Sequence, residues 1–310
     1  MKYCSKMDRI LVEPLAETVR RSPKMLVDAA ECSYQSKILD LAKTILQSDD
    51  RIILLTGPSS SGKTTTAKLL QQKLISFGKS VYRISLDNFY KQEEELPLWN
   101  DGYVNYESID ALDLEHFNAL MERLMREGAA QFPIFDFVKG RRSEETFPVV
   151  MKEDTYIIFE GIHALNPLLS RQFAPEKIMR VYVSVHSDFV SESGEVILDA
   201  RSLRLLRRIL RDQVHRDTGP VETLSMWEYV VRGEEEYIKP FRCYADYHLN
   251  SAHSYEPFVY AKTAVDSLAS FVEHPKYGEL IRRLLLAEQR FEPLSPSWIP
   301  RDSLLTEFIS

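Results

Sequence analysis

The stretch "LLTGPSSSGKTTTAKLL", residues 54–70, satisfies the pattern G-x-x-x-x-G-K-[ST] in full. In a loop of this pattern, backbone N–H groups and the N-terminus of the following helix bind phosphate oxygens. The lysine reaches the β- and γ-phosphates, and the hydroxyl of the next residue ligates Mg²⁺. An apolar run precedes the loop and helical spacing follows it, as the motif requires. The sequence therefore predicts a nucleoside triphosphate site at Gly57, Ser59, Ser60, Ser61, Gly62, Lys63, Thr64 and Thr65.

Two carboxylates follow other apolar runs of the chain. Asp87 lies just after "SVYRIS", and Glu160 ends "TYIIFE". In phosphoryl transfer one carboxylate can accept the proton of the attacking hydroxyl, and another can hold Mg²⁺. Aspartate also commonly caps a turn, and a glutamate at a strand end can simply be solvated. Because both residues follow predicted strands in a chain with a phosphate loop, we expect Asp87 to be a catalytic base and Glu160, with Thr64, to be a metal ligand.

A run of arginines, "RSLRLLRRILRD", is the next chemical signal. Arg204, Arg207, Arg208 and Arg211 lie at i, i+3, i+4 and i+7 on one face of a predicted helix, and Arg216 follows. This face could be a solvated surface, an RNA-binding stripe, or a lid that closes over the transferring phosphoryl group. Given the phosphate loop, we predict a lid at about residues 196–220, carried by Arg207, Arg208, Arg211 and Arg216.

The elements that must position these residues alternate along the chain. Apolar runs predict strands at 52–55, 80–87, 155–161, 178–185 and 245–251. Helical spacing predicts helices at 67–77, 114–124, about 196–213, about 224–237 and 261–272. Such alternation predicts a doubly wound α/β fold with a mostly parallel sheet covered on both faces. Ligands bind beyond the carboxyl ends of strands in such sheets, which is where the phosphate loop and both carboxylates fall.

Three segments do not fit the alternation. Residues 1–50 read as a helical N-terminal extension on the outside of the domain, with an apolar stripe at Ile38, Leu41, Ala42 and Ile45. Within the expected phosphate-loop domain, 51–273, "QFPIFDFVKGRRSEETFPVV" predicts a β-hairpin arm at about 131–152. Its polar turn is expected near 139–145. The proline-rich segment 274–310 predicts an extension that wraps the domain.

The composition is that of an ordinary globular protein, with 44% hydrophobic and 27% charged residues among 310. The formal charge of −7 disfavours non-specific binding to nucleic acid. No apolar run approaches the ~20 residues that a membrane span needs, and Asp8 and Arg9 interrupt any signal peptide. Cys4, Cys32 and Cys243 show no CxxC spacing. We therefore expect a reduced, cytoplasmic protein, monomeric or homo-oligomeric, without membrane or nucleic-acid partners.

In order, "GPSSSGKTT", "SLDNFY", "PIFDF", "IIFEGIHALNP" and "RLLRRILRD" resemble the uridine kinase and phosphoribulokinase family of P-loop kinases, over roughly residues 52–251. "MWEYVVRGEEEYIKPF", "ADYHLNSA" and "IPRDSLLTEFI" are similar to a bacterial uridine kinase-like branch. The resemblance implies ATP-dependent phosphorylation of a hydroxyl, with Asp87 as the base. It also implies Lys63 and Thr64 on the phosphates and magnesium, and residues 207–216 as the lid.

The resemblance also implies an acceptor site, and there the sequence departs from the family. The aspartate that grips the ribose in uridine–cytidine kinases is Glu107 here, in "NYE". The tyrosine that opens a Tyr-Asp-Phe stretch is Phe135, and the histidine that reads the base is replaced at or near Gly140. Tyr90 completes the implied site. Phe135 can stack but has no hydroxyl, so the phosphate machinery is kept while recognition of the base is altered.

The sequence thus predicts an ATP-dependent kinase of a small molecule, with uridine or a related nucleoside as the first choice of acceptor. A kinase of a sugar or another non-nucleoside alcohol is the alternative within enzymes. A non-catalytic nucleotide sensor and an RNA-associated ATPase are the alternatives from other classes. The joint presence of Asp87, Glu160 and the arginines argues against the sensor, whereas RNA-stimulated turnover with steep salt dependence is the mark of the RNA-associated ATPase.

Overall fold

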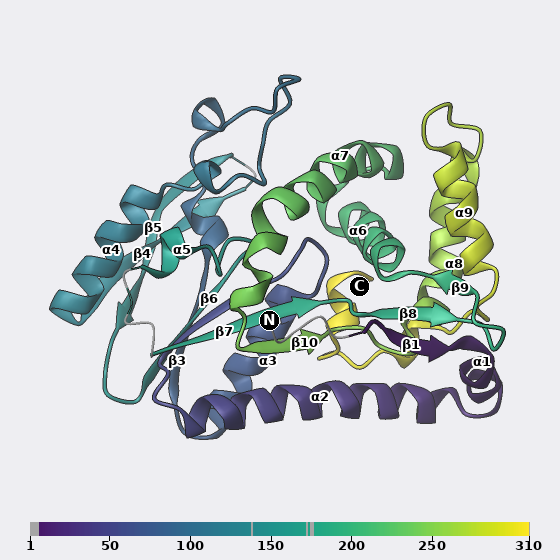
Figure 1. Cartoon of the computed structure of the whole chain (residues 1–310), viewed down its shortest axis with the longest axis horizontal. Coiled ribbons are helices and arrows are strands. Elements are labelled where there is room, and N and C mark those ends of the chain that lie inside the picture. Colours follow the sequence, from purple (N-terminus) through teal and green to yellow (C-terminus); the bar gives the residue numbers. More distant parts are fainter. Residues whose placement is uncertain (1–5, 138, 172, 174–176, 310) are drawn as a thin grey trace.

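The computed structural model describes residues 6–137, 139–171, 173 and 177–309. A five-stranded sheet lies at its centre, in the order β10-β7-β2-β6-β3, and all pairs of neighbours are parallel (Figure 1). Its strands are β2 (Ile52–Thr56), β3 (Ser80–Ser85), β6 (Thr155–Glu160), β7 (Ile178–Ser184) and β10 (Tyr247–Asn250). Every residue of β2 and β6 is buried, as expected of strands covered on both faces. The predicted doubly wound α/β fold is confirmed.

Alternate residues of the strands face two separate hydrophobic clusters. Ile53 and Leu55 of β2 belong to one cluster, and Ile52 and Leu54 belong to the other. The first cluster includes α1 (Val12–Arg21), α2 (Pro23–Gln47), α3 (Lys63–Ser76), α6 (Ala200–Arg216), α7 (Pro220–Gly233), α8 (Glu256–Leu268) and α9 (Gly278–Glu288). The second includes α4 (Leu114–Glu127), α5 (Pro167–Ser170) and the hairpin strands β4 (Ala129–Asp136) and β5 (Arg141–Val150).

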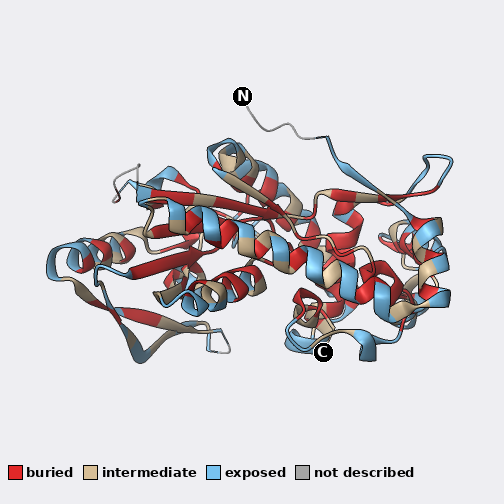
Figure 2. Cartoon of the chain, turned by 90° about the horizontal axis from the view of Figure 1, so that it is seen from below, coloured by how far each residue is buried: buried red, intermediate tan, exposed pale blue. Residues whose placement is uncertain are grey.

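The N-terminal segment forms part of the first cluster. α2 runs along the sheet and packs on α3, and its predicted apolar stripe is fully buried, at Ile38, Leu41, Ala42 and Ile45. Figure 2 shows that helices carry both buried and exposed residues, whereas the central strands are almost continuously buried. The helical prediction is wrong for β1 (Asp8–Leu11), which pairs in parallel with β8 (Ser187–Val190). A strand of four residues is too short to show a period in the sequence.

Two other predicted boundaries are corrected by the structure. The helix expected from about 196 begins at Ala200, because β9 (Val196–Leu198) pairs with β8 and the Asp199 carboxylate caps the helix N-terminus. The hairpin arm is confirmed as an antiparallel pair. Its turn is earlier than expected, since β5 begins at Arg141. The helix expected to reach residue 237 ends as α7 at Gly233 and continues as a π-helix, Glu234–Ile238.

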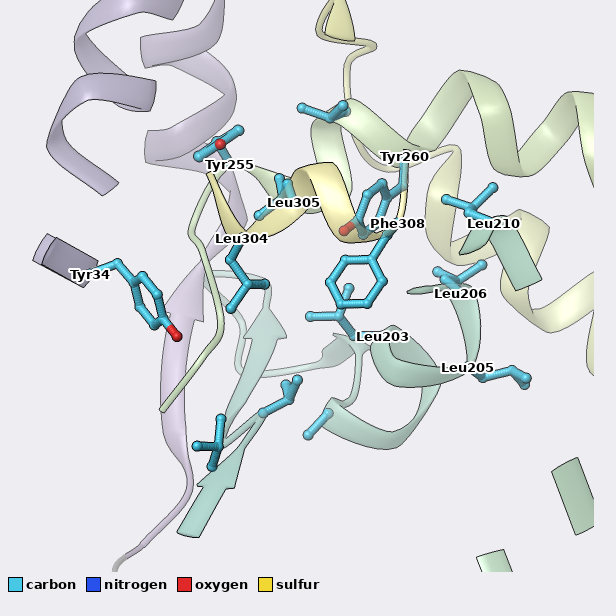
Figure 3. Packing of buried hydrophobic residues seen from close by; sticks show 14 of the residues in the cluster. Tyr34, Leu203, Leu205, Leu206, Leu210, Tyr255, Tyr260, Leu304, Leu305 and Phe308 are labelled. Atoms are coloured by element: carbon cyan, nitrogen blue, oxygen red, sulfur yellow. The ribbon is translucent and has the colours of Figure 1, made fainter. Parts of the chain in front are cut away.

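The C-terminal segment packs into the hydrophobic core. After α9 it closes with a 3₁₀ helix, Leu304–Glu307. Leu304, Leu305 and Phe308 are fully buried and belong to the same hydrophobic cluster as the leucines of α6 and Tyr34 of α2, part of which Figure 3 shows. The two terminal segments and the P-loop domain therefore share one hydrophobic core.

Two further expectations concern membranes and thiols. Among the described residues, no helix is long and apolar enough to cross a membrane. Cys32 and Cys243 are free thiols on exposed residues, and Cys4 lies outside the described residues.

Candidate active site

The phosphate loop connects β2 to α3 in a conformation that leaves polar groups unpaired. Gly62 has a positive φ of 83°, and Ser60 has one of 58°, which is uncommon for a residue with a side chain. The hydroxyls of Ser60 and Ser61 are buried without hydrogen-bond partners. The Lys63 ammonium donates to the Pro58 carbonyl at 3.2 Å. Unpaired hydroxyls and a lysine around a helix N-terminus suit the oxygens of a phosphate chain.

Glu160 lies at the centre of the strand ends. The parallel register places it opposite Leu55 of β2 on one side and Ser85 of β3 on the other. Its carboxylate oxygens both lie 3.4 Å from the Thr64 hydroxyl, and the guanidinium of Arg83 is 3.6 Å away. Burial, followed by the negative charge of Asp87, raises the pKa of Glu160 to about 7. A buried carboxylate with this much unfavourable charge fits a site for a divalent cation.

The remaining ligands of such a cation would come from phosphates and water. In the described part of the chain, no group of three His, Cys, Asp or Glu side chains is arranged to hold a metal. Mg²⁺ commonly binds through one or two protein oxygens and completes its shell with phosphates and waters. The Thr64 hydroxyl and the Glu160 carboxylate are the two protein oxygens that fit this role.

Asp87 follows β3 on a short 3₁₀ helix, Leu86–Phe89. Its backbone N–H donates to the Ser85 hydroxyl at 3.3 Å, which fixes the turn at the strand end. Burial raises the pKa of the Asp87 carboxyl, and the positive charges of Lys63, Arg216 and Arg211 oppose the rise. The carboxylate therefore lies within electrostatic reach of both the P-loop lysine and the end of α6.

Glu107 lies in the loop before α4, within electrostatic reach of Lys63 and Asp87. Its N–H donates to the Asn105 side chain at 3.2 Å, and its Oε2 atom is buried without a hydrogen-bond partner. Burial raises its pKa to about 7, opposed by Arg208 and Lys63. α7 approaches so closely that a Cβ atom on Gly233 would lie 2.1 Å from the Glu107 Cβ. Because residue 233 is a glycine, the loop that carries Glu107 can pack directly against α7, and this loop holds an unsatisfied carboxylate.

Tyr90 and Phe135 lie together beside this carboxylate loop. Their ring centroids are 6.3 Å apart in an edge-to-face arrangement, and the Tyr90 hydroxyl donates to the Tyr106 carbonyl at 2.9 Å. The Phe135 N–H donates to the Asn88 side chain at 3.1 Å, which ties the hairpin arm to the residue after Asp87. The structure thus brings all three residues of the implied acceptor site to the carboxyl ends of the strands.

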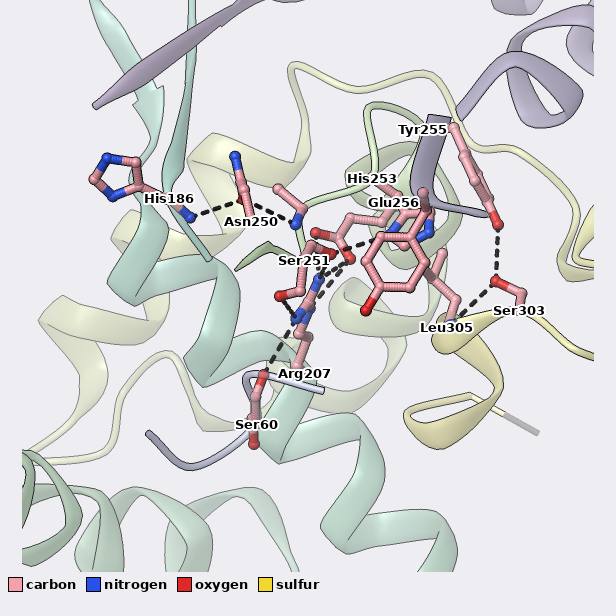
Figure 4. Close-up of polar contacts among 12 residues, drawn as sticks. Ser60, His186, Arg207, Asn250, Ser251, His253, Tyr255, Glu256, Ser303 and Leu305 are labelled. Carbon is pink, nitrogen blue, oxygen red and sulfur yellow. Dashed lines mark hydrogen bonds and ion pairs between the residues drawn. The ribbon is translucent and has the colours of Figure 1, made fainter. Parts of the chain in front are cut away.

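Arg207 differs from the expectation of a lid residue. Its guanidinium is 0% exposed and makes a bidentate ion pair with Glu256, with a shortest distance of 2.7 Å. It also donates to the Ser251 carbonyl and to the Ser60 carbonyl of the P-loop (Figure 4). Because its charge is paired and its donors are used, Arg207 supports the strained P-loop from behind instead of facing the site.

The other arginines of α6 are distributed around the loop. Arg208 donates to the Ser59 hydroxyl at 2.7 Å and pairs with Asp212 at 3.0 Å. Arg211 and Arg216 also pair with Asp212, and both act on the Asp87 carboxyl. Arg204, Arg207 and Arg208 are buried, so the face expected for a solvated or RNA-binding stripe is not exposed on α6. Of the four arginines predicted to form the lid, Arg208, Arg211 and Arg216 remain candidates for that role.

Comparison with known proteins identifies the family. The sequence profile of the "Phosphoribulokinase / Uridine kinase family" matches residues 52–255, about two thirds of the chain. The chain belongs to this family. It is 31% identical over 202 residues to a uridine kinase of Bacillus pumilus (65% of this chain, 86% of the relative). It is 28% identical over 225 residues to a uridine kinase of Clostridium botulinum (72% of this chain, 96% of the relative).

A solved structure supports the fold of this phosphoribulokinase/uridine kinase family member. A kinase assigned to a fructose transport system of Silicibacter sp. TM1040 superimposes with a TM-score of 0.51 at 17% identity, over 68% of this chain and 98% of that one. The expectation of a phosphotransferase that acts on a hydroxyl is confirmed by family membership.

Several residues at the site were not predicted from the sequence. Arg83 beside Glu160, Asn88 beneath the hairpin arm and Asn105 beneath Glu107 each hold a predicted residue in position. Asn88 follows Asp87 directly, and Asn105 lies two residues before Glu107, so proximity in sequence was a usable signal. Glu307 could not be found in this way. Its carboxylate accepts a hydrogen bond from the Thr65 hydroxyl at 2.6 Å, and the two residues are 242 positions apart in the sequence.

Proposed function

We propose that this protein is an ATP- and Mg²⁺-dependent nucleoside kinase that phosphorylates a hydroxyl of uridine, cytidine or a closely related ribonucleoside. One observation carries the proposal. The half-buried Asp87 carboxyl lies at the carboxyl ends of a parallel sheet, within electrostatic reach of Lys63 of the P-loop and of Arg211 and Arg216 of α6. A base that lies among the cations of a phosphate site is what phosphoryl transfer to a hydroxyl needs. The relatives named as uridine kinases support the acceptor class.

In the proposed reaction, Asp87 accepts the proton of the acceptor hydroxyl as its oxygen bonds to the γ-phosphorus of ATP. The bond between the γ-phosphorus and the β,γ-bridging oxygen breaks, and ADP leaves with the electron pair. The raised pKa of Asp87 makes the carboxylate a better proton acceptor than an ordinary aspartate. Mg²⁺, held by Thr64 and Glu160, would neutralise charge on the phosphates.

The cations of the site would stabilise the charge that develops on the transferring group. Lys63 lies on the P-loop, and Arg211 and Arg216 extend from the last turns of α6. Their guanidinium groups match the several equatorial oxygens of a phosphoryl group better than one ammonium does. Because Arg216 is about half exposed, it has room to move toward a bound phosphate.

The side chains of Tyr90, Glu107 and Phe135 suit a ribose and a stacked base. Glu107 has a buried carboxylate oxygen without a partner, although the residue as a whole is only partly buried. A carboxylate can accept hydrogen bonds from two neighbouring hydroxyls, such as the 2′- and 3′-hydroxyls of a ribose. The edge-to-face rings of Tyr90 and Phe135 offer an apolar surface for a base. We also propose a cytoplasmic location, which the two exposed free thiols favour.

The test is ATP consumption with Mg²⁺ against a panel of nucleosides, sugars and small alcohols. Native protein is compared with Asp87→Asn, in which the base is lost and the shape is kept. We expect turnover with uridine or cytidine that Asp87→Asn abolishes. Turnover with a sugar or a non-nucleoside alcohol alone would replace the acceptor and keep the mechanism. If no acceptor stimulates ATP consumption and both proteins behave alike, the kinase proposal fails.

A further inference from the structure

The C-terminal tail, residues 302–309, contains the 3₁₀ helix Leu304–Glu307, which lies directly against the P-loop. Its Glu307 carboxylate accepts a hydrogen bond from the Thr65 hydroxyl at 2.6 Å. Its Leu304 side chain covers Gly62, where an added Cβ would lie 2.5 Å from the Leu304 Cδ1 atom. Both tail residues lie far outside residues 52–255, the part of the chain that matches the family. A carboxylate from outside the matched region therefore lies beside the phosphate loop.

Buried side chains and polar contacts hold the tail against the rest of the domain. Leu304, Leu305 and Phe308 are 0% exposed and belong to the hydrophobic cluster that includes the leucines of α6 (Figure 3). The Phe308 ring lies 4.9 Å from the Arg207 guanidinium carbon. At the start of the tail, the Ser303 hydroxyl donates to Glu31 of α2 at 2.6 Å. Removal of three fully buried side chains from the core would be strongly unfavourable, so the tail stays in place when a nucleotide binds.

Glu307 differs from these anchors because its side chain is only partly buried. Its negative charge reaches the phosphate site. Burial lowers the pKa of the Lys63 ammonium, and Glu307 is one of three carboxylates that oppose this effect. Burial also raises the pKa of Glu160, and Glu307 adds to that rise. A charge that acts on both residues also acts on any phosphate bound between them.

Glu307 and a bound phosphate would also compete for the hydroxyl proton of Thr65. A threonine hydroxyl has one proton to donate, and Glu307 accepts it in this structure. An ionised phosphate oxygen is also only an acceptor, so it competes with Glu307 for the same proton. Resting on the proposed role of the P-loop, we propose that Glu307 sets the affinity for the donor nucleotide by opposing its phosphates, through its charge and through its hold on Thr65.

The substitution Glu307→Gln tests this inference, because it removes the charge and keeps the size. A glutamine amide can still accept from Thr65 and can also donate to a phosphate oxygen. We expect Glu307→Gln to bind ATP about three- to tenfold more tightly than the native protein. The gain should be smaller for ADP and absent for adenosine. A tightening that scales with phosphate charge is not a result that damage to the fold would produce.

Isothermal titration calorimetry with ATP, ADP and adenosine, each with Mg²⁺, measures these affinities. The matched control is Asp302→Asn, which removes one negative charge from the exposed start of the same tail, and it should bind all three ligands as the native protein does. The pair Thr65→Val and Thr65→Val/Glu307→Gln separates the two effects. If the hold on Thr65 contributes, the gain from Glu307→Gln will be smaller in the Thr65→Val background.

Three outcomes would overturn the inference. Glu307→Gln could bind ATP no more tightly than the native protein does, or it could change adenosine and ATP affinity equally. Either result, with ATP bound by the native protein, removes the role of Glu307 and leaves the proposed function standing. Failure of the native protein to bind ATP would instead overturn the proposed function, and the inference with it.

Discussion

The buried charged residues on the two sides of the P-loop differ in whether other protein groups pair with them. In front of the loop, Asp87, Glu107 and Glu160 are carboxyls whose pKa values are raised by burial, and Glu107 has an oxygen without a partner. Behind the loop, burial also raises the pKa of Glu256, but Glu256 and Arg207 are both 0% exposed and form a bidentate ion pair that opposes this rise. The front is electrostatically unfavourable until a ligand or cation arrives. The back is complete without one.

This difference teaches how to tell a binding charge from a structural one. Burial alone does not separate them, because Glu160 is nearly as buried as Arg207. What separates them is whether partners from the protein satisfy the charge. A satisfied buried pair gives rigidity to its surroundings, here to Ser60 of the P-loop. An unsatisfied buried carboxyl favours protonation or a cation.

The largest expected effect comes from a substitution in front of the P-loop. Asp87→Asn should lower turnover by about 10²- to 10⁴-fold, because the proton acceptor is lost. Its melting temperature should stay the same or rise, because a carboxyl with a raised pKa makes folding less favourable at neutral pH. Steady-state kinetics and thermal unfolding of the same preparation measure both. A clear fall in melting temperature would mean that Asp87 is structural and would remove the contrast with Arg207.

A substitution behind the P-loop should instead lower the stability of the fold. Arg207→Met should lower the free energy of unfolding by about 3–5 kcal/mol, since it leaves Glu256 buried and unpaired. Urea denaturation monitored by circular dichroism measures the loss. The double variant Arg207→Met/Glu256→Leu should recover part of it, because both charges are then absent. A loss under about 1 kcal/mol in the single variant would contradict the structural role.

The front carboxyls also predict a pH dependence of stability. Glu107 and Glu160 have pKa values of about 7 in the fold, above the ordinary value of 4.5. The folded protein holds protons that the unfolded chain has lost, so stability falls as pH rises through 7. Between pH 6.5 and 8 each carboxyl should remove roughly 0.8 kcal/mol from the free energy of unfolding.

The variant Glu160→Gln isolates one of these two contributions. Urea denaturation at pH 6.5 and at pH 8, without nucleotide or metal, should show a smaller loss of stability for Glu160→Gln than for the native protein. Subtracting the two proteins cancels the groups that they share. Equal losses would indicate that Glu160 does not titrate in this range.

The smallest expected effect concerns the acceptor. Phe135→Tyr adds a hydroxyl beside Tyr90, at the position where the resemblance in sequence implies a tyrosine. We expect the KM for uridine or cytidine to fall about two- to fivefold with kcat unchanged, as one added hydrogen bond to a bound base allows. Initial rates over a range of nucleoside concentrations measure this. A rise in KM would mean that the site takes an acceptor without a polar group beside residue 135.

Much of the front of the site could be predicted from the sequence. The P-loop pattern, the strand before it and the strand ends at Asp87 and Glu160 are local signals, and parallel strands bring their carboxyl ends together. The roles of α6 could not be divided in the same way. Helical spacing placed its arginines on one face, yet it could not indicate that Glu256, 49 residues from Arg207, pairs with one of them.

The sequence by itself therefore determined the phosphate loop, the alternation of strands and helices, and the apolar stripe of α2. Each of these depends on residues within a few turns or one strand of one another, so local pattern is sufficient. Only the tertiary structure decided that Arg207 lies behind the loop and that Glu307 holds Thr65. Whether a charge is satisfied depends on which distant segment packs against it, and for Thr65 that segment is 242 residues away.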